Sequence, residues 1–319
     1  MPSVEATGAK LYFEESGYGY PIIFIHEFAS DMRGWDAQIG HFSRSYRCIA
    51  YNARGYPPSD VPEDPQSYGW ELAVDDIAAL MRHLDIEQAH LIGLSMGGYA
   101  ALQFGLRYPE RVGAIVAGSV GSGCHPAHRD AWLRETSVPS RIFVEHGMVT
   151  MAERMARGPA RVQLKYKDRQ RWREFILRLR QHSPQGMAKT MAHCQAARPS
   201  LHDLSHQLSD MAIPVLLAVG DEDTRCLETN LMLKSELPNA GLWICPNTGH
   251  AINLEEPAAF NAQVENFLGA VERGSWLRGF PATATIPSLV RSRGARRDHS
   301  LIQIDQETEG ADVVRLHLR

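Results

Sequence analysis

The 319-residue sequence lacks a strong excess of either charge, because 33 Lys and Arg residues face 37 Asp and Glu residues, for a formal net charge of −4. Proteins that bind nucleic acid usually carry a basic surface, so we expect no nucleic-acid partner. No run of about 18 apolar residues occurs, so we expect no membrane span and no membrane partner. The opening MPSVEATGAK has no basic start followed by an apolar stretch, and we expect no signal peptide.

Cysteine is scarce and unpatterned, with five residues and no C-x-x-C spacing. Reduced, scattered thiols of this kind are typical of a cytoplasmic protein. No G-x-G-x-x-G follows the first apolar run and no phosphate-binding G-x-x-x-x-G-K-[ST] is present, so a nucleotide is not indicated. Two histidine pairs, His125 with His128 and His202 with His206, lack a companion cysteine or carboxylate at a strong spacing. The sequence therefore predicts no cofactor and no metal.

Short apolar runs alternate with amphipathic helical patterns through most of the chain. Continuous apolar runs of this length are typical of strands buried on both faces of a parallel sheet. The runs cover residues 22–25, 48–51, 90–94, 112–118, 214–220 and 241–245. Helical periodicity covers residues 75–84, 99–108 and 257–271. Strands that alternate with helices predict an α/β fold with a doubly wound, mostly parallel sheet.

The alternation stops between residues 122 and 205, where helical patterns prevail. In RWREFILRLR the apolar residues recur at i, i+3, i+4 and i+7, as on one face of a helix. We therefore expect a helical cap over residues 122–205, inserted into a core made of residues 1–121 and 206–273. Residues 274–319 have little periodicity and predict an irregular C-terminal extension, to which we assign no catalytic role.

The segment HLIGLSMGGYAALQFG, residues 90–105, places Ser95 between an apolar run and a helical pattern. Gly93-Leu94-Ser95-Met96-Gly97 fits G-x-S-x-G. A nucleophile on a sharp strand-to-helix turn needs small residues two positions before and after it, because side chains there would crowd the turn. The turn also aims the next helix N-terminus at the site, where it favours developing negative charge. Ser95 is therefore the candidate nucleophile.

Over residues 10–272 the sequence resembles the α/β-hydrolase superfamily, and its G-L-S-M-G-G segment is similar to that of esterases, C–C hydrolases and cofactor-free haloperoxidases. The resemblance implies an eight-stranded sheet and the chain order serine, acid, histidine. His250, in the loop CPNTGHAINLEEP, is then the base. Asp223, in the G-x-x-D segment after residue 219, is the acid, with Asp221 as its rival.

The resemblance also implies an oxyanion hole made by the backbone N–H groups of Met96 and Phe28. Phe28 lies in the loop His26-Glu27-Phe28, where His26 is expected to hold the loop by hydrogen bonds. Glu27 departs from the family, which commonly has glycine there. Two interpretations stay open: its side chain points away and pairs with Arg54 or His26, or its charge borders the pocket and disfavours anionic substrates.

These residues predict a serine hydrolase that cleaves a small-molecule carboxylic ester through an acyl-enzyme on Ser95. The alternative within enzymes is hydrolysis of a C–C bond in a meta-cleavage-type diketo acid. A non-catalytic ligand receptor with the same fold is the alternative of another class. The substrate would be a small molecule, and the oligomeric state is left open, with a homodimer as one option. Arg54 and Ser59, in the loop after the second apolar run, are expected to be structural.

Overall fold

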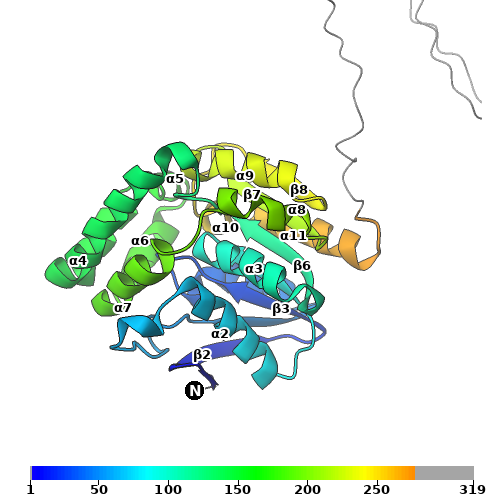
Figure 1. Cartoon of the computed structure of the whole chain (residues 1–319), viewed down its shortest axis with the longest axis horizontal. Helices are drawn as coiled ribbons and strands as arrows, with labels where there is room; N and C mark the ends of the chain where they lie inside the picture. The colour runs from blue at the N-terminus through cyan, green and yellow to red at the C-terminus, as the bar shows by residue number, and fades with distance from the viewer. Residues whose placement is uncertain (1, 277–319) are drawn as a thin grey trace, which may run out of the picture. The chain divides into compact units, whose positions relative to one another are not determined.

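An eight-stranded sheet forms the centre of the computed structural model, which describes residues 2–276 but no side chains for residues 137–141. The strand order is β1-β2-β4-β3-β5-β6-β7-β8. Strands β3 to β8 are parallel, whereas β1 and β2 form an antiparallel edge (Figure 1). The strands are β1 (Ser3–Ala6), β2 (Ala9–Ser16), β3 (Tyr20–Ile25), β4 (Tyr46–Tyr51), β5 (Ala89–Leu94), β6 (Val112–Gly118), β7 (Val215–Gly220) and β8 (Ala240–Cys245).

The predicted doubly wound, mostly parallel sheet of eight strands is confirmed. Each of the six apolar runs lies on one of the parallel strands, β3 to β8, and their boundaries agree to within two residues. Strands β1 and β2 were not located individually from the sequence.

Helices cover both faces of the sheet, as the continuous apolar character of its strands requires. One buried apolar cluster joins the sheet to α2, α3, α8 and α9, and a second joins its other face to α1 and α11. The helices of the core are α1 (Asp36–Phe42), α2 (Trp70–His83), α3 (Met96–Arg107), α8 (Ser205–Ser209), α9 (Thr224–Glu236), α10 (Ile252–Glu255) and α11 (Pro257–Glu272). Short 3₁₀ turns lie at Met32–Trp35, Pro65–Ser67 and Pro109–Arg111.

The segment after β6 is helical, and its described residues contain no strand before β7. It consists of α4 (Pro126–Ala156), α5 (Val162–Lys167), α6 (Arg169–Leu179), α7 (Pro184–Lys189), a π-helical turn (Thr190–Gln195) and a 3₁₀ turn (Leu201–Leu204). Figure 1 shows α4 to α7 grouped together beside the sheet. Gly147, with φ +69°, breaks α4 into two helical stretches. The boundaries of the cap stay a prediction, because residues 2–276 all belong to one compact unit.

The cap is tied to the core by a third buried apolar cluster. Phe143 and Met151 of α4 belong to it, together with Phe28 after β3 and Met96 at the start of α3. The rings of Phe28 and Phe143 are 5.9 Å apart. The loops expected to supply the oxyanion hole are therefore anchored by packing against the cap.

The predicted C-terminal extension begins inside the described residues and continues beyond them. Trp276 packs its ring 4.7 Å from that of Phe267 and donates a hydrogen bond to the Asn239 carbonyl at 3.0 Å. The irregular character predicted for residues 277–319 lies outside the described residues. In the part of the chain that is described, no helix combines the length and apolar character needed to cross a membrane.

Candidate active site

Ser95 sits on a sharp turn between β5 and α3, as G-x-S-x-G predicts. Its φ of +54° and ψ of −107° are unusual for a residue with a side chain, and its amide donates to the Gly118 carbonyl at 2.7 Å. A Cβ on Gly93 would lie 2.2 Å from the Gly97 carbonyl oxygen, and one on Gly97 would lie 2.0 Å from the Ile25 carbonyl oxygen. The two glycines thus permit the close backbone approach on which the turn depends.

Asp223 and His250 are brought together by the loops that follow β7 and β8. His250 Nδ1 lies 2.8 Å from Asp223 Oδ2, and both residues are buried. Gly220 makes the contact between the two loops possible, since a Cβ there would lie 2.0 Å from the Thr248 carbonyl oxygen. Asp221 instead accepts a hydrogen bond from the Thr248 amide at 3.1 Å. Asp223 is therefore the carboxylate that contacts the imidazole, and Asp221 fixes the histidine loop.

The contact with Asp223 determines how His250 is charged. Burial opposes the imidazolium, but the Asp223 carboxylate outweighs it and raises the pKa of His250 above 6.5. Burial likewise opposes the carboxylate, yet His250 lowers the pKa of Asp223 below 3.8. An ionised Asp223 accepts a hydrogen bond from the protonated Nδ1, which leaves Nε2 unprotonated and able to act as a base toward a hydroxyl group. The contact of Nε2 with the Ser95 hydroxyl stays a prediction.

The loop after β3 carries the predicted Phe28 amide, and His26 holds this loop in place. The amide of Ala53 donates to His26 Nε2 at 3.0 Å, so Nδ1 carries the proton and donates to the Glu27 carbonyl at 2.7 Å. Burial lowers the pKa of His26 to about 4, so the ring is neutral near pH 7. His26 therefore holds this loop by hydrogen bonds, as the sequence predicts.

The amides of Phe28 and Met96 are free to act as donors. Within residues 2–276 neither amide donates a hydrogen bond to another protein group. The Phe28 carbonyl is used, since it accepts from the Tyr56 hydroxyl at 2.8 Å. A Cβ at Gly97 would also approach the His26 carbonyl oxygen to 2.9 Å, so the turn at Ser95 packs against the loop of Phe28. Their joint action on an oxyanion stays a prediction.

Glu27 pairs with Arg161 of the cap, so the expectation of a partnership with Arg54 or His26 was wrong. Arg161 lies directly before α5, and its Nη2 donates to Glu27 Oε2. Both side chains are buried. The same Glu27 oxygen lies 3.9 Å from His250 Nε2. The Glu27 carboxylate, at the position where the resemblance implies glycine, thus reaches the edge of the imidazole, and Arg161 of the cap balances its charge.

Arg54 and Ser59 have structural contacts, as expected. Arg54 forms two hydrogen bonds with the buried Asp76 carboxylate of α2, at 2.9 and 2.5 Å. Because its guanidinium is engaged there, Arg54 does not pair with Glu27. The Ser59 hydroxyl donates to the Asn52 carbonyl at 2.6 Å and accepts from the Tyr12 amide at 2.8 Å. These bonds fix the loop after β4 against β2 and α2.

A cavity of about 390 Å³ adjoins the imidazole. Its wall includes His250 and Asp223 from the core, and Met155, Pro159 and Arg161 from the cap. Arg161 lines it and Glu27 does not, while the carboxylates of Glu222 and Asp223 and a second arginine, Arg225, also belong to its wall. Its volume is within the range of small-molecule sites.

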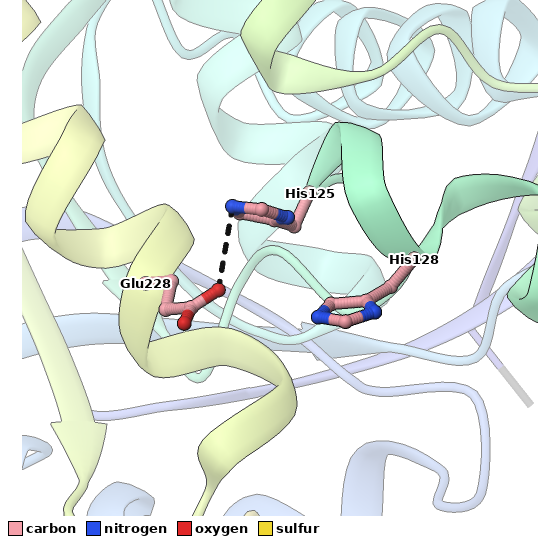
Figure 2. A group of neighbouring side chains, drawn as sticks. All are labelled: His125, His128 and Glu228. Carbon is pink, nitrogen blue, oxygen red and sulfur yellow. Dashed lines mark ion pairs between the residues drawn. The ribbon is translucent and has the colours of Figure 1, made fainter.

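The first histidine pair gains a carboxylate neighbour that the sequence did not reveal. Figure 2 shows His125, His128 and Glu228 together, with His125 Nε2 3.4 Å from Glu228 Oε2. His125 also accepts from the Ala127 amide through Nδ1 at 3.3 Å and packs against the His202 ring at 5.5 Å. These contacts fit the start of α4 against α9, and we assign the group no part in the reaction.

The second histidine pair is separated. His202 belongs to the 3₁₀ turn and faces His125, whereas the His206 side chain is 95% exposed and lies 3.8 Å from Asp210. The four-residue spacing therefore does not produce a shared face for ligands.

Sequence reasoning missed two residues at the site, Arg161 and Cys226. The Cys226 thiol donates to the Ser119 carbonyl at 3.3 Å and lies 3.8 Å from His250 Nδ1. Burial raises the pKa of this thiol well above 9, so it stays neutral. One usable signal for Cys226 was its spacing of three residues after Asp223. Arg161, in a segment with many arginines, carried no such signal.

Comparisons with known proteins agree on the family to which the chain is similar. The family model described as alpha/beta hydrolase fold matches residues 20–257. Three curated relatives are similar to most of the chain. A putative 2-succinyl-6-hydroxy-2,4-cyclohexadiene-1-carboxylate synthase of Bacillus subtilis is 26% identical over 255 residues, 78% of this chain and 90% of the relative. The 3-oxoadipate enol-lactonase 2 of Acinetobacter baylyi is 27% identical over 254 residues, 76% and 86% respectively.

The third relative has a further activity. The 2-hydroxy-6-oxo-6-phenylhexa-2,4-dienoate hydrolase of Burkholderia cepacia is 26% identical over 268 residues, 81% of this chain and 91% of that protein. The names of the three relatives cover different reactions on one scaffold, so the fold alone does not select a substrate. The matched family model and the eight-stranded sheet, with the sharp turn at Ser95, lead to one conclusion: this chain belongs to the α/β-hydrolase family.

Proposed function

We propose that this protein is a serine hydrolase that cleaves a small-molecule carboxylic ester through an acyl-enzyme on Ser95. The observation that carries the proposal is the 2.8 Å contact between His250 and Asp223, at the same sheet edge as the strained Ser95 turn. A serine hydroxyl becomes a useful nucleophile only when a neighbouring imidazole takes its proton. A buried carboxylate that holds this imidazole in one tautomer completes the set.

In the proposed reaction Ser95 Oγ attacks the ester carbonyl carbon while His250 Nε2 takes the hydroxyl proton. The oxyanion is stabilised by the amides of Phe28 and Met96, each worth roughly 3 kcal/mol of barrier. His250 then protonates the leaving alcohol. Water, deprotonated by the same nitrogen, attacks the acyl-enzyme and releases the acid. Asp223 stabilises the imidazolium at both stages.

Hydrolysis of a C–C bond in a meta-cleavage-type diketo acid is the second candidate. It is favoured by the similarity to the Burkholderia cepacia dienoate hydrolase, whereas ester chemistry is favoured by the similarity to the enol-lactonase, since a lactone is a cyclic ester. Both reactions would use Ser95 and His250. The candidates therefore differ in substrate rather than in the groups at the site.

A panel of neutral and anionic p-nitrophenyl and methyl esters of increasing acyl length, assayed beside a coloured diketo acid, tests the proposal. We expect ester turnover in the wild type and a loss of kcat of at least about 10⁴-fold in Ser95→Ala. Full ester hydrolysis by Ser95→Ala would contradict the assignment. Bleaching of the diketo acid without turnover of any ester would favour the second candidate.

The remaining features of the proposal follow from the sequence. We propose a cytoplasmic protein, since its five cysteines are free and buried.

The alternative of another class is a receptor with the same fold. A receptor that binds ligand without turnover would keep the pocket, but its Ser95 would not react. Failure of a fluorophosphonate probe to label the protein would favour that class.

A further inference from the structure

The Glu27–Arg161 pair is an ion pair taken almost completely out of water, and it joins the core to the cap. The residues are 2% and 3% exposed. Removing two charges from water is costly, and their mutual attraction returns only part of this cost. Such a pair adds little net stability, so its position beside the imidazole needs another explanation.

Glu27 is close to the nitrogen that the reaction requires, yet is not bonded to it. Its Oε2 lies 3.9 Å from His250 Nε2, beyond hydrogen-bond distance. A shift of this carboxylate oxygen by about 1 Å would bring it within hydrogen-bond distance of Nε2. A carboxylate bonded to Nε2 would occupy the place of the serine hydroxyl and would hold the imidazole protonated.

One contact restrains Glu27. Its Oε1 is buried and has no hydrogen-bond partner within residues 2–276, so its carboxylate is held through Oε2 by Arg161 Nη2. Arg161 is itself fixed by the cap: Nη1 donates to the Ala160 carbonyl at 2.7 Å, and the guanidinium lies 5.2 Å from the centre of the Phe175 ring. The cap therefore positions Arg161, and Arg161 positions Glu27.

We propose that Arg161 is a positioning residue, which holds the Glu27 carboxylate off His250 Nε2 and so keeps this nitrogen available to Ser95. The inference rests on the proposed function, in which Nε2 is the base. It makes the cap part of the catalytic arrangement: loss of the cap arginine would allow a core carboxylate to capture the base.

The charges around His250 predict how its protonation responds. Asp223 and Cys226 face Nδ1, Glu27 faces Nε2, and Arg161 lies behind Glu27. Glu255 accepts from the amides on either side of the imidazole, those of Gly249 and Ala251, and the thiol of Cys226 is neutral. Asp223 and Glu27 favour the imidazolium, whereas Arg161 opposes it. Removing Arg161 therefore raises the pKa of His250, and removing the Glu27 charge lowers it.

The test is a double-mutant cycle of Arg161→Met, Glu27→Gln and both together, with a neutral p-nitrophenyl ester as substrate. We expect Arg161→Met to lower kcat on the order of 100-fold with little change in KM, and to move the acid limb of kcat/KM to higher pH. Glu27→Gln should move this limb to lower pH. The double variant should recover at least about tenfold in kcat over Arg161→Met, because the carboxylate that captures the base is gone.

Two controls accompany the cycle. Arg157→Met removes another cap arginine, whose pair with Glu153 is exposed, and should leave kcat unchanged. Arg161→Lys keeps the charge and should retain most of the activity even where Arg161→Met fails to fold. A folded double variant as inactive as Arg161→Met would overturn the proposal, because Arg161 would then act on the substrate directly.

A measurement without substrate separates this inference from the proposed function. Imidazole NMR titration of His250 should give a higher pKa in Arg161→Met and a lower one in Glu27→Gln than in the wild type. The expected shifts in a protein with no esterase activity would reject the ester proposal and keep the positioning role. Unshifted values in folded variants of an active esterase would reject the positioning role alone.

Discussion

At some positions of the site the backbones of two loops come so close that only glycine fits between them. At Gly220 the loops of Asp223 and His250 leave no room for a side chain, because a Cβ there would lie 2.0 Å from the Thr248 carbonyl oxygen. Gly40, in the middle of α1, has no such neighbour: a Cβ there would meet nothing within 4 Å. The two glycines therefore form a matched pair for substitution.

Gly220→Ala should lower both stability and activity. The added methyl group must push the two loops apart, at a cost of about 1–3 kcal/mol in the free energy of unfolding, and it should lengthen the contact between Asp223 and His250. Urea unfolding and kcat measure the two effects. Gly40→Ala should be neutral or stabilising by up to about 1 kcal/mol, because alanine is favoured over glycine in a helix. Equal behaviour of the two variants would show that the loop contact is unimportant.

The pH dependence of activity should reflect the charged neighbours of His250. The base must be neutral to accept a proton, so kcat/KM falls as pH drops through the pKa of His250. That pKa is raised, mainly by Asp223 acting against burial, so the acid limb should have its midpoint above pH 6.5. A midpoint below 6.5 in the wild type would contradict the account.

Asp223→Asn should lower kcat by about 10⁴-fold, because the imidazole of His250 is no longer held in the tautomer that leaves Nε2 unprotonated.

The sequence predicted site residues whose contacts are made within a single turn, but it did not predict contacts between residues far apart in the chain. The turn at Ser95 is recognisable because the serine and its two glycines lie within five positions. Glu27 is conspicuous as a departure, but its partner Arg161 is 134 positions away in a helical segment rich in arginine. Only the packing of the cap on the core selects Arg161 over its neighbours.

At the scale of elements, α6 shows how the cap supports the site. Phe175, on its buried face, is 5% exposed and lies under the Arg161 guanidinium. Leu177, two positions further on, is 55% exposed. The apolar spacing in the sequence predicted this division of faces, since Phe175, Ile176 and Leu179 are buried.

Phe175→Ala should destabilise the protein by about 3–5 kcal/mol, because it leaves a cavity in the apolar cluster of the cap. It also removes the ring that supports Arg161, so kcat should fall beyond what residual folding explains. Leu177→Ala, the matched control, should change the free energy of unfolding by less than about 0.5 kcal/mol. Chemical denaturation monitored by tryptophan fluorescence measures both, and a small effect at Phe175 would show that the cap is not packed as described.

Strands β1 and β2 lack a clear strand pattern in the sequence for a physical reason. They form the antiparallel edge of the sheet, and β2 alternates buried with exposed residues instead of forming a continuous apolar run. The parallel strands, buried on both faces, gave the clear signal. The unequal visibility of the strands thus follows from their place in the sheet.

At the scale of the whole molecule, the site is assembled at the carboxyl ends of parallel strands. Glu27 and Phe28 follow β3, Ser95 follows β5, Asp223 follows β7, and His250 follows β8. The alternation of strands and helices predicted this edge, because parallel strands end on the same side of a sheet. The order of the strands, β3-β5-β6-β7-β8, could not be obtained from the sequence pattern alone.

Covalent labelling tests the central claim, that Ser95 is an activated nucleophile, most directly. The folded full-length chain would be treated with a fluorophosphonate probe, digested and analysed by mass spectrometry, with Ser95→Ala and Ser59→Ala treated in parallel. The account predicts one modified residue, Ser95, labelled in the wild type and in any folded Ser59→Ala protein but not in Ser95→Ala. A wild type that stays unlabelled, or that is labelled at another residue while Ser95 is untouched, would contradict it.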